Sequence, residues 1–127
     1  MYQELYLNAK LLSNMPENIL NILQLMTGDM SIENLSITTD ALFKTDNWQY
    51  MLQSESSRFD LAARSTIDYS PVDDCYFLRV SCSLNNNDKQ IEKFLGFINS
   101  YLDKKPGQFL GYIRHEDNEN PFIVRKI

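Results

Sequence analysis

Apolar and polar residues alternate along the first part of the chain. Leu5, Leu7, Ala9 and Leu11 occupy every second position of residues 2–12, and mostly polar residues lie between them. Because successive side chains of a strand point to opposite faces, this alternation is typical of a strand with one buried face. We therefore predict a half-buried strand over residues 2–12.

Two later segments have apolar residues at helical spacing. Asn14-Met15-Pro16-Glu17 has the pattern of a capping box, and Gly28 is a natural stop, so a helix is predicted between them. Asn87-Asp88-Lys89-Gln90 offers a second capping box, and Pro106-Gly107 ends the helix that follows. The apolar stripes of the two helices are Ile19, Leu20, Leu23 and Met26, and Ile91, Phe94, Leu95, Ile98, Tyr101 and Leu102.

The remaining periodic segments predict strands. They are residues 48–54, a hairpin of 64–70 and 75–84, and a last hairpin of 109–115 and 122–127. In residues 75–84, alternation places Leu78 and Val80 inward and Phe77 and Arg79 outward. Residues 29–47 are polar with little periodicity, which predicts a long loop, functional or mobile, with a short helical turn.

Together these elements predict one α+β domain over residues 1–127. The chain order is β-α-β-β-β-α-β-β, which has too few helices to alternate through a parallel sheet. The simplest packing is a mostly antiparallel sheet with two helices packed on one face. The opposite face is then free to meet something else.

Composition and charge narrow the classes of function. The chain has 17 acidic and 12 basic residues, a net charge of −5, which disfavours nucleic-acid and membrane binding. The charge permits a basic protein partner, although a role in solubility alone is the commoner reason for a moderate net charge. The start of the chain lacks a signal-peptide pattern, and no apolar run reaches the roughly 20 residues of a membrane span, so we expect a cytoplasmic protein.

The residues that carry metal, cofactor or nucleophile chemistry form no known motif. Cys75 and Cys82 lie on one predicted strand, about 23 Å apart and on opposite faces, so no disulfide joins them. The chain has one histidine, no glycine-rich phosphate loop and no calcium-loop spacing. We therefore predict no catalytic residue, no metal and no cofactor.

His115 and the outward aromatic residues are the groups that stand out. His115 lies among Arg114, Glu116 and Asp117, where a general base can be built, although a solvated turn is the commoner arrangement. Aromatic side chains on a sheet face are typical of cross-strand packing or of a protein interface. The partner-binding residues that we predict are Trp48, Tyr50, Phe77, Arg79, Tyr112 and Glu116.

Several segments together resemble a known group of proteins. They are LNAKL, LFKTDNWQYML, SCSLNNNDKQIEKFLGFINSYLD and PGQFLGYIRHEDNENP, which cover most of the chain. The chain resembles an uncharacterised family of small acidic bacterial proteins associated with mobile or phage-derived DNA. The resemblance implies a fold and a setting, and it transfers no site, because the group has no assigned activity.

These observations favour a non-enzymatic protein-binding module, similar to an immunity protein or a phage-encoded inhibitor. The first alternative is a small enzyme or ligand-binding protein with a pocket under residues 29–47, where Arg114, His115 and Asp117 supply the polar groups. The second alternative is a self-associating structural protein, for example a homodimer. A deep, partly apolar pocket favours the first alternative, whereas a flat, aromatic sheet face favours the binding module.

Overall fold

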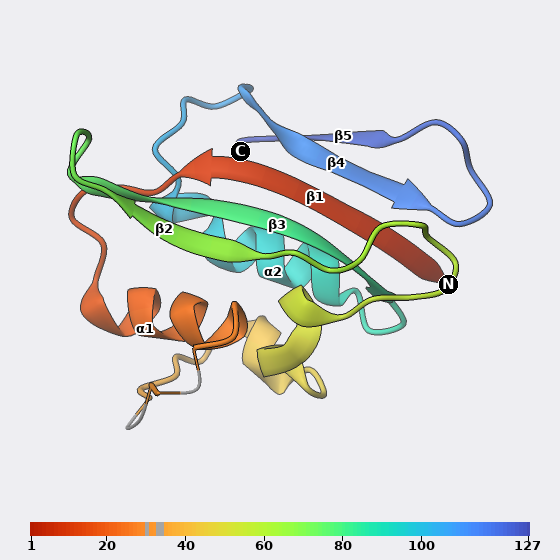
Figure 1. The fold of residues 1–127 in the computed structure, drawn as a ribbon, viewed down its shortest axis with the longest axis horizontal. Coiled ribbons are helices and arrows are strands. Elements are labelled where there is room, and N and C mark those ends of the chain that lie inside the picture. The colour runs from red at the N-terminus through yellow and green to blue at the C-terminus, as the bar shows by residue number, and fades with distance from the viewer. Residues whose placement is uncertain (30, 33–34) are drawn as a thin grey trace.

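The computed structural model describes residues 1–29, 31–32 and 35–127, and it folds into one sheet with helices beside it (Figure 1). The elements in chain order are β1 (Tyr2–Lys10), α1 (Glu17–Met26), the 3-10 helices η1 (Ala41–Lys44) and η2 (Trp48–Gln53), β2 (Thr66–Ser70), β3 (Cys75–Asn85), α2 (Gln90–Ile98), the 3-10 helix η3 (Asn99–Tyr101), β4 (Phe109–His115) and β5 (Phe122–Arg125). No helix in this described part is long and apolar enough to cross a membrane.

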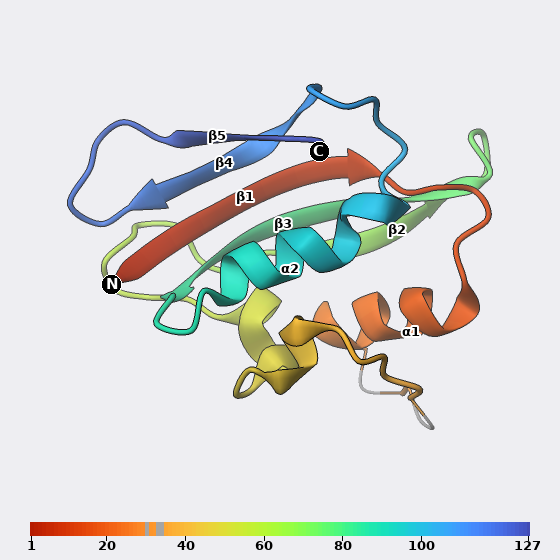
Figure 2. The ribbon, with the colours of Figure 1, turned by 180° about the vertical axis from the view of Figure 1, so that it is seen from behind.

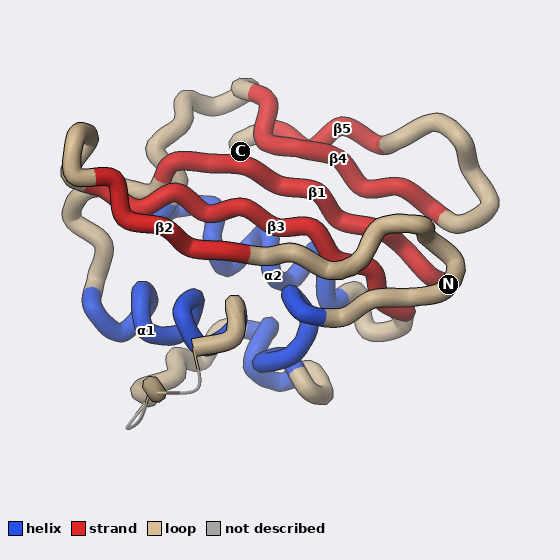
Figure 3. The backbone as a smooth tube through the Cα atoms, viewed as in Figure 1, coloured by secondary structure: helices blue, strands red, loops and turns tan. Residues whose placement is uncertain are grey.

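The sheet is antiparallel, with the strand order β2-β3-β1-β4-β5 (Figure 3). The first strand of the chain, β1, lies at its centre and pairs with β3 on one side and β4 on the other. In this register Leu5 lies between Cys82 and Ile113, and Leu7 lies between Val80 and Gly111. The predicted α+β class with a mostly antiparallel sheet is therefore confirmed.

Both α-helices lie on the same side of the sheet, as the sequence predicts. α2 lies behind β1 and β3 in Figure 1 and in front of them in the reversed view of Figure 2. The alternate residues Leu5, Leu7 and Ala9 of β1 point to this side and are buried. Ile22 and Leu23 of α1 pack over these residues and close the core. Buried residues of α2 pack beside them.

One predicted strand is wrong, because residues 48–53 form the 3-10 helix η2. The buried residues Met51 and Leu52 follow the buried Trp48 by three and four residues, whereas Tyr50 is exposed, and this is the spacing of a helix. The aromatic residues at positions 48 and 50 suggested the two-residue period of a strand, but the segment is helical. The chain order therefore contains one strand fewer than predicted.

Neither predicted capping box forms. Pro16 precedes α1, and its carbonyl oxygen accepts from the backbone N–H groups of Ile19 and Leu20 without a side-chain cap. Lys89 precedes α2 in a left-handed conformation with φ of 51°. Asn86, three residues earlier, caps instead, because its Oδ1 accepts from the N–H of Ile91 at 2.9 Å.

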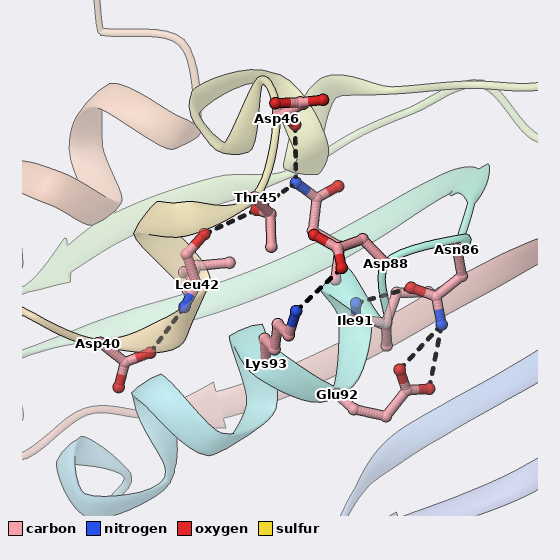
Figure 4. A network of polar contacts seen from close by, with 10 residues as sticks. Asp40, Leu42, Thr45, Asp46, Asn86, Asp88, Ile91, Glu92 and Lys93 are labelled. Atoms are coloured by element: carbon pink, nitrogen blue, oxygen red, sulfur yellow. Dashed lines mark hydrogen bonds and ion pairs between the residues drawn. The ribbon is translucent and has the colours of Figure 1, made fainter.

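The described part of residues 29–47 is tied to the start of α2 (Figure 4). Gln90 Nε2 donates to Thr45 Oγ1 at 2.8 Å and to the carbonyl oxygen of Asp46 at 3.1 Å. Leu42 of η1 is buried, so the predicted short helical turn is present and contacts the core. Residues 30, 33 and 34 of the predicted loop lie outside the described residues.

The two cysteines on β3 are free, as the spacing predicts. Both are buried, Cys75 included, although the alternation of the strand placed it on the outward face. Cys82 lies opposite Leu5 and faces the core, where burial raises the pKa of its thiol to about 12. The charge of Glu4 adds a smaller increase. The thiol of Cys82 therefore stays protonated in the folded protein.

We expect two glycine-to-alanine substitutions to change stability in opposite directions. A Cβ at Gly111 would lie 1.9 Å from the carbonyl oxygen of Tyr6, so G111A should lower the free energy of unfolding by about 3 kcal/mol or more. A Cβ at Gly96 in α2 meets nothing within 4 Å, so G96A should raise it by up to about 1 kcal/mol. Urea unfolding followed by circular dichroism measures both, and a mild effect of G111A would contradict the tight strand contact.

We also expect the thiol of Cys82 to make stability depend on alkaline pH. The thiol ionises near its ordinary pKa of 9.0 when the chain is unfolded, but only at about 12 when it is folded. The unfolded state therefore loses its proton first, and stability falls as the pH rises through this window. Urea unfolding between pH 8 and 10 should show a steeper fall for the wild type than for C82A, and equal slopes would contradict the burial.

Candidate functional site

The side of the sheet opposite the helices is a candidate binding surface, which we call the helix-free face. Glu4, Tyr6 and Asn8 of β1 point there, because they alternate with the buried Leu5, Leu7 and Ala9. The strand register places further side chains beside them. The helix-free face consists of Tyr2, Glu4, Tyr6, Asn8, Lys10, Thr66, Asp68, Phe77, Arg79, Ser81, Tyr112, Arg114 and Ile123.

A stacked pair of tyrosines lies at the middle of the helix-free face. Tyr6 of β1 and Tyr112 of β4 are directly opposite in register, and their ring centres lie 5.3 Å apart with planes inclined by 17°. Tyr6 is 38% exposed and Ile123 of β5, opposite Tyr112, is 41% exposed. The side chains of Tyr6, Tyr112 and Ile123 form an apolar surface that is partly exposed to solvent.

One end of the helix-free face is covered by residues 54–65, the yellow-green segment that crosses in front of β1 in Figure 1. Phe59 of this segment is buried, and the guanidinium of Arg114 lies 5.2 Å from the centre of its ring. Arg58 Nη1 donates to Glu116 Oε2 at 2.7 Å. The exposed part of the face therefore begins beyond this segment, at Tyr6 and Tyr112.

A buried carboxylate lies beneath the covered end. Glu4 is buried, and its Oε1 lies 3.4 Å from Nη2 of Arg114. Burial and the nearby charge of Glu4, in that order, raise the pKa of Tyr112 above its usual range. The hydroxyl of Tyr112 is therefore neutral at physiological pH and can both donate and accept hydrogen bonds.

Four of the six predicted partner-binding residues lie on the helix-free face or at its covered end. Phe77, Arg79 and Tyr112 share the helix-free face, and Glu116 lies at its covered end in the ion pair with Arg58. The other two predicted residues, Trp48 and Tyr50, lie elsewhere, because they belong to η2 rather than to a strand. Trp48 is 9% exposed and packs edge-to-face on Phe43, whereas Tyr50 is 54% exposed.

The prediction did not include Tyr6 and Ile123 among the partner-binding residues. The alternation of β1 already directs Tyr6 away from the core, so this signal was present in the sequence. Its contact with Tyr112, however, depends on the register between strands that lie about a hundred residues apart in the chain. The position of Ile123 likewise depends on the pairing of β5 with β4.

A second candidate site is an apolar cleft between α2 and the β4–β5 hairpin. Its volume is about 860 Å³, within the range of about 300–1,000 Å³ that is usual for ligand sites. The apolar lining is Leu95, Leu102, Leu110, Ile113, Phe122, Val124 and Ile127. A smaller hollow of about 250 Å³ lies beside Asp29, close to the segment where the sequence suggested a pocket.

His115 is the one member of the predicted polar set Arg114, His115 and Asp117 that lines the cleft. Gln3 Nε2 lies 2.8 Å from His115 Nε2, and Asn86 Nδ2 donates to Gln3 Oε1 at 2.7 Å. Asn86 Nδ2 also contacts both carboxylate oxygens of Glu92 at 3.0 Å. This chain of amides holds His115 and Glu92 in place at one end of the cleft.

The cleft has the groups of a binding site rather than those of a nucleophilic centre. None of the described residues that line it is Ser, Thr, Cys or Lys, so His115 has no nucleophile beside it there. Across residues 1–29, 31–32 and 35–127, no group of three or more His, Cys, Asp or Glu is arranged to hold a metal ion. The arrangement can bind apolar groups and orient a polar group at its His115 end.

Comparisons of the chain with protein-family models, with curated proteins and with solved structures find no match. The resemblance to small acidic bacterial proteins therefore stays a prediction.

We expect the Glu4–Arg114 pair to contribute more to stability than an exposed ion pair. E4Q removes the charge of the buried carboxylate and leaves the half-buried Arg114 without its partner, and should lower the free energy of unfolding by about 1–2 kcal/mol. D103N removes the exposed pair of Lys10 and Asp103, 3.8 Å apart, and should cost less than about 0.5 kcal/mol. Urea unfolding of both variants tests this, and equal costs would contradict the importance of the buried carboxylate.

Proposed function

We propose that this chain is a non-enzymatic protein-binding module whose partner docks on the exposed part of the helix-free face. The stacked pair of Tyr6 and Tyr112 carries the proposal. Tyrosine is among the residues that contribute most to binding energy at protein interfaces, especially near the centre of the contact. Phe77 and Arg79, residues of β3 on the same face, add the residue types that are enriched there.

The tyrosines are suited to binding because they are already ordered. Both project from interior strands of the sheet and are packed against each other before a partner arrives. A side chain that is immobile in the free protein loses little conformational entropy on binding. The hydroxyl groups can then pair with polar atoms of the partner while the rings are covered.

The charge of the chain supports a basic partner. Acidic residues exceed basic ones by five, and exposed acidic turns follow β2 at Asp73 and Asp74 and follow β4 at Asp117 and Glu119. Opposite charge on a partner speeds association and excludes wrong partners more than it adds affinity. In this proposal the chain covers a functional surface of a basic protein, as an immunity protein or a phage-encoded inhibitor does.

One double variant, compared with one single variant as its control, tests the proposal. Y6A combined with Y112A should remain folded, with a loss of stability of about 2 kcal/mol or less, because both rings are partly exposed. The double variant should capture little of the partner that the wild type captures from lysate of the native host. With that partner purified, the affinity should fall by about 30-fold or more, because hot-spot side chains contribute at least about 2 kcal/mol.

The control is Y50A, which removes an exposed tyrosine from η2, away from the helix-free face. Y50A should bind as tightly as the wild type. The rate of association should also fall as the salt concentration rises, because charge attraction is screened. If the double variant binds normally, or if light scattering shows a dimer that the double variant abolishes, partner binding at this face is refuted.

A further inference from the structure

The cleft defined above lies between one helix and the last strand of the sheet. α2 and β5 run in the same direction, and β4 and β1 lie between them in the reversed view (Figure 2). Glu92 and Phe122 lie near one end of the cleft, and Asn99 and Ile127 lie near the other. A ligand in the cleft would therefore lie along β5.

β5 is an edge strand, since within the described part of the chain it pairs with β4 alone. The backbone of Lys126, just after β5, bonds toward β4: its N–H donates to the Gln108 carbonyl, and its carbonyl accepts from Gly107. The bulge of this hairpin lies in β4, so the backbone alternation of β5 is unbroken. Ile123, Arg125 and Ile127 therefore direct their backbone groups away from β4, toward the free edge.

Asn99 shows how this free edge can be used. Its Oδ1 accepts from the N–H of Ile127 at 3.1 Å, and its Nδ2 donates to the carbonyl oxygen of Ile127 at 3.3 Å. The side-chain amide thus pairs with the edge of the chain as the backbone of an added strand would. Asn99 follows α2, so at this point the edge is turned toward the helix and the cleft.

The cleft has room for apolar side chains from an added strand. Phe122 is 69% exposed although it lines the cleft, and Leu95 of α2 lies only partly buried on the opposite wall. Between these walls, Gly96 leaves open space, because a Cβ there would meet nothing within 4 Å. Every second side chain of a strand along β5 would enter this space, and the others would point to the opposite side.

Charge distinguishes one end of the cleft. Glu92 lines the end near the acidic turn that contains Asp117 and Glu119. A strand added antiparallel to β5 would leave the cleft near this turn. Charge complementarity then favours basic residues at the end of the added segment.

We propose that the cleft binds an extended segment of another polypeptide, which pairs antiparallel with the free edge of β5 and places alternate apolar side chains between α2 and the hairpin. This mode of recognition combines backbone hydrogen bonds for affinity with side-chain pockets for specificity. It is independent of binding at the helix-free face, and either site can be tested without the other.

A synthetic peptide with alternating leucine and threonine and two C-terminal lysines tests the inference. Fluorescence anisotropy should show saturable binding to the wild type, and a peptide with the two lysines at its N-terminus should bind at least threefold more weakly. G96E places a charged side chain in the open space and should weaken binding at least tenfold. G96A is the matched control and should bind as the wild type does, because a methyl group occupies little of the cleft.

Backbone methylation separates strand addition from simple apolar binding. Two versions of the peptide carry N-methyl groups at alternate residues, on one or the other edge of the strand. One version should lose binding at least tenfold and the other should retain it, since an added strand bonds through one edge. Equal binding of both versions, or no effect of G96E, would overturn the proposal.

Two other occupants of the cleft are distinguished by the same variants. If laurate binds to the wild type and not to G96E while the peptides do not bind, the cleft is a site for apolar small molecules and the proposal fails. If light scattering shows a dimer that G96E dissociates, a second copy of this chain occupies the cleft, and the proposal of a different polypeptide fails.

Discussion

The pairing of β1 with both β3 and β4 is the constraint on which the rest of the structure depends. Because β1 is the central strand, its alternation decides which side of the whole sheet is buried. Leu5, Leu7 and Ala9 form the floor of the core, and the residues between them set the composition of the opposite face. A shift of one residue in the pairing register of β1 would bury Tyr6 and expose Leu5. The same register therefore determines both the core and the proposed partner surface.

The sequence predicted the features that depend on local periodicity. The alternation of β1 and β3, the stripes of α1 and α2 and the outward position of Phe77 and Arg79 all follow from spacing within one element. Trp48 and Tyr50 were misplaced because two aromatic residues at alternate positions suggest a strand, whereas burial of Met51 and Leu52 against the core favours the turn of η2. In that short segment, tertiary packing overrode the local pattern.

The cleft could not be predicted, because it results from the order of the strands rather than from any segment alone. The helices cover the β2, β3 and β1 side of the sheet, and β4 and β5 extend past α2 (Figure 2). The chain builds a sheet that is wider than the layer of helices above it. Apolar residues of β5 such as Phe122 and Ile123 are therefore exposed in the structure.

Gly111 links the packing on the core side of the sheet to the tyrosine pair on the helix-free face. It faces the core on β4, where its missing side chain lets the strand approach the carbonyl oxygen of Tyr6, and its neighbour Tyr112 stacks on the ring of Tyr6 on the other side. The separation of the two rings is therefore governed by the backbone contact beneath them. Substitutions can therefore change the surroundings of the tyrosine pair, whereas the spacing at its centre cannot be adjusted by exchanging interior side chains.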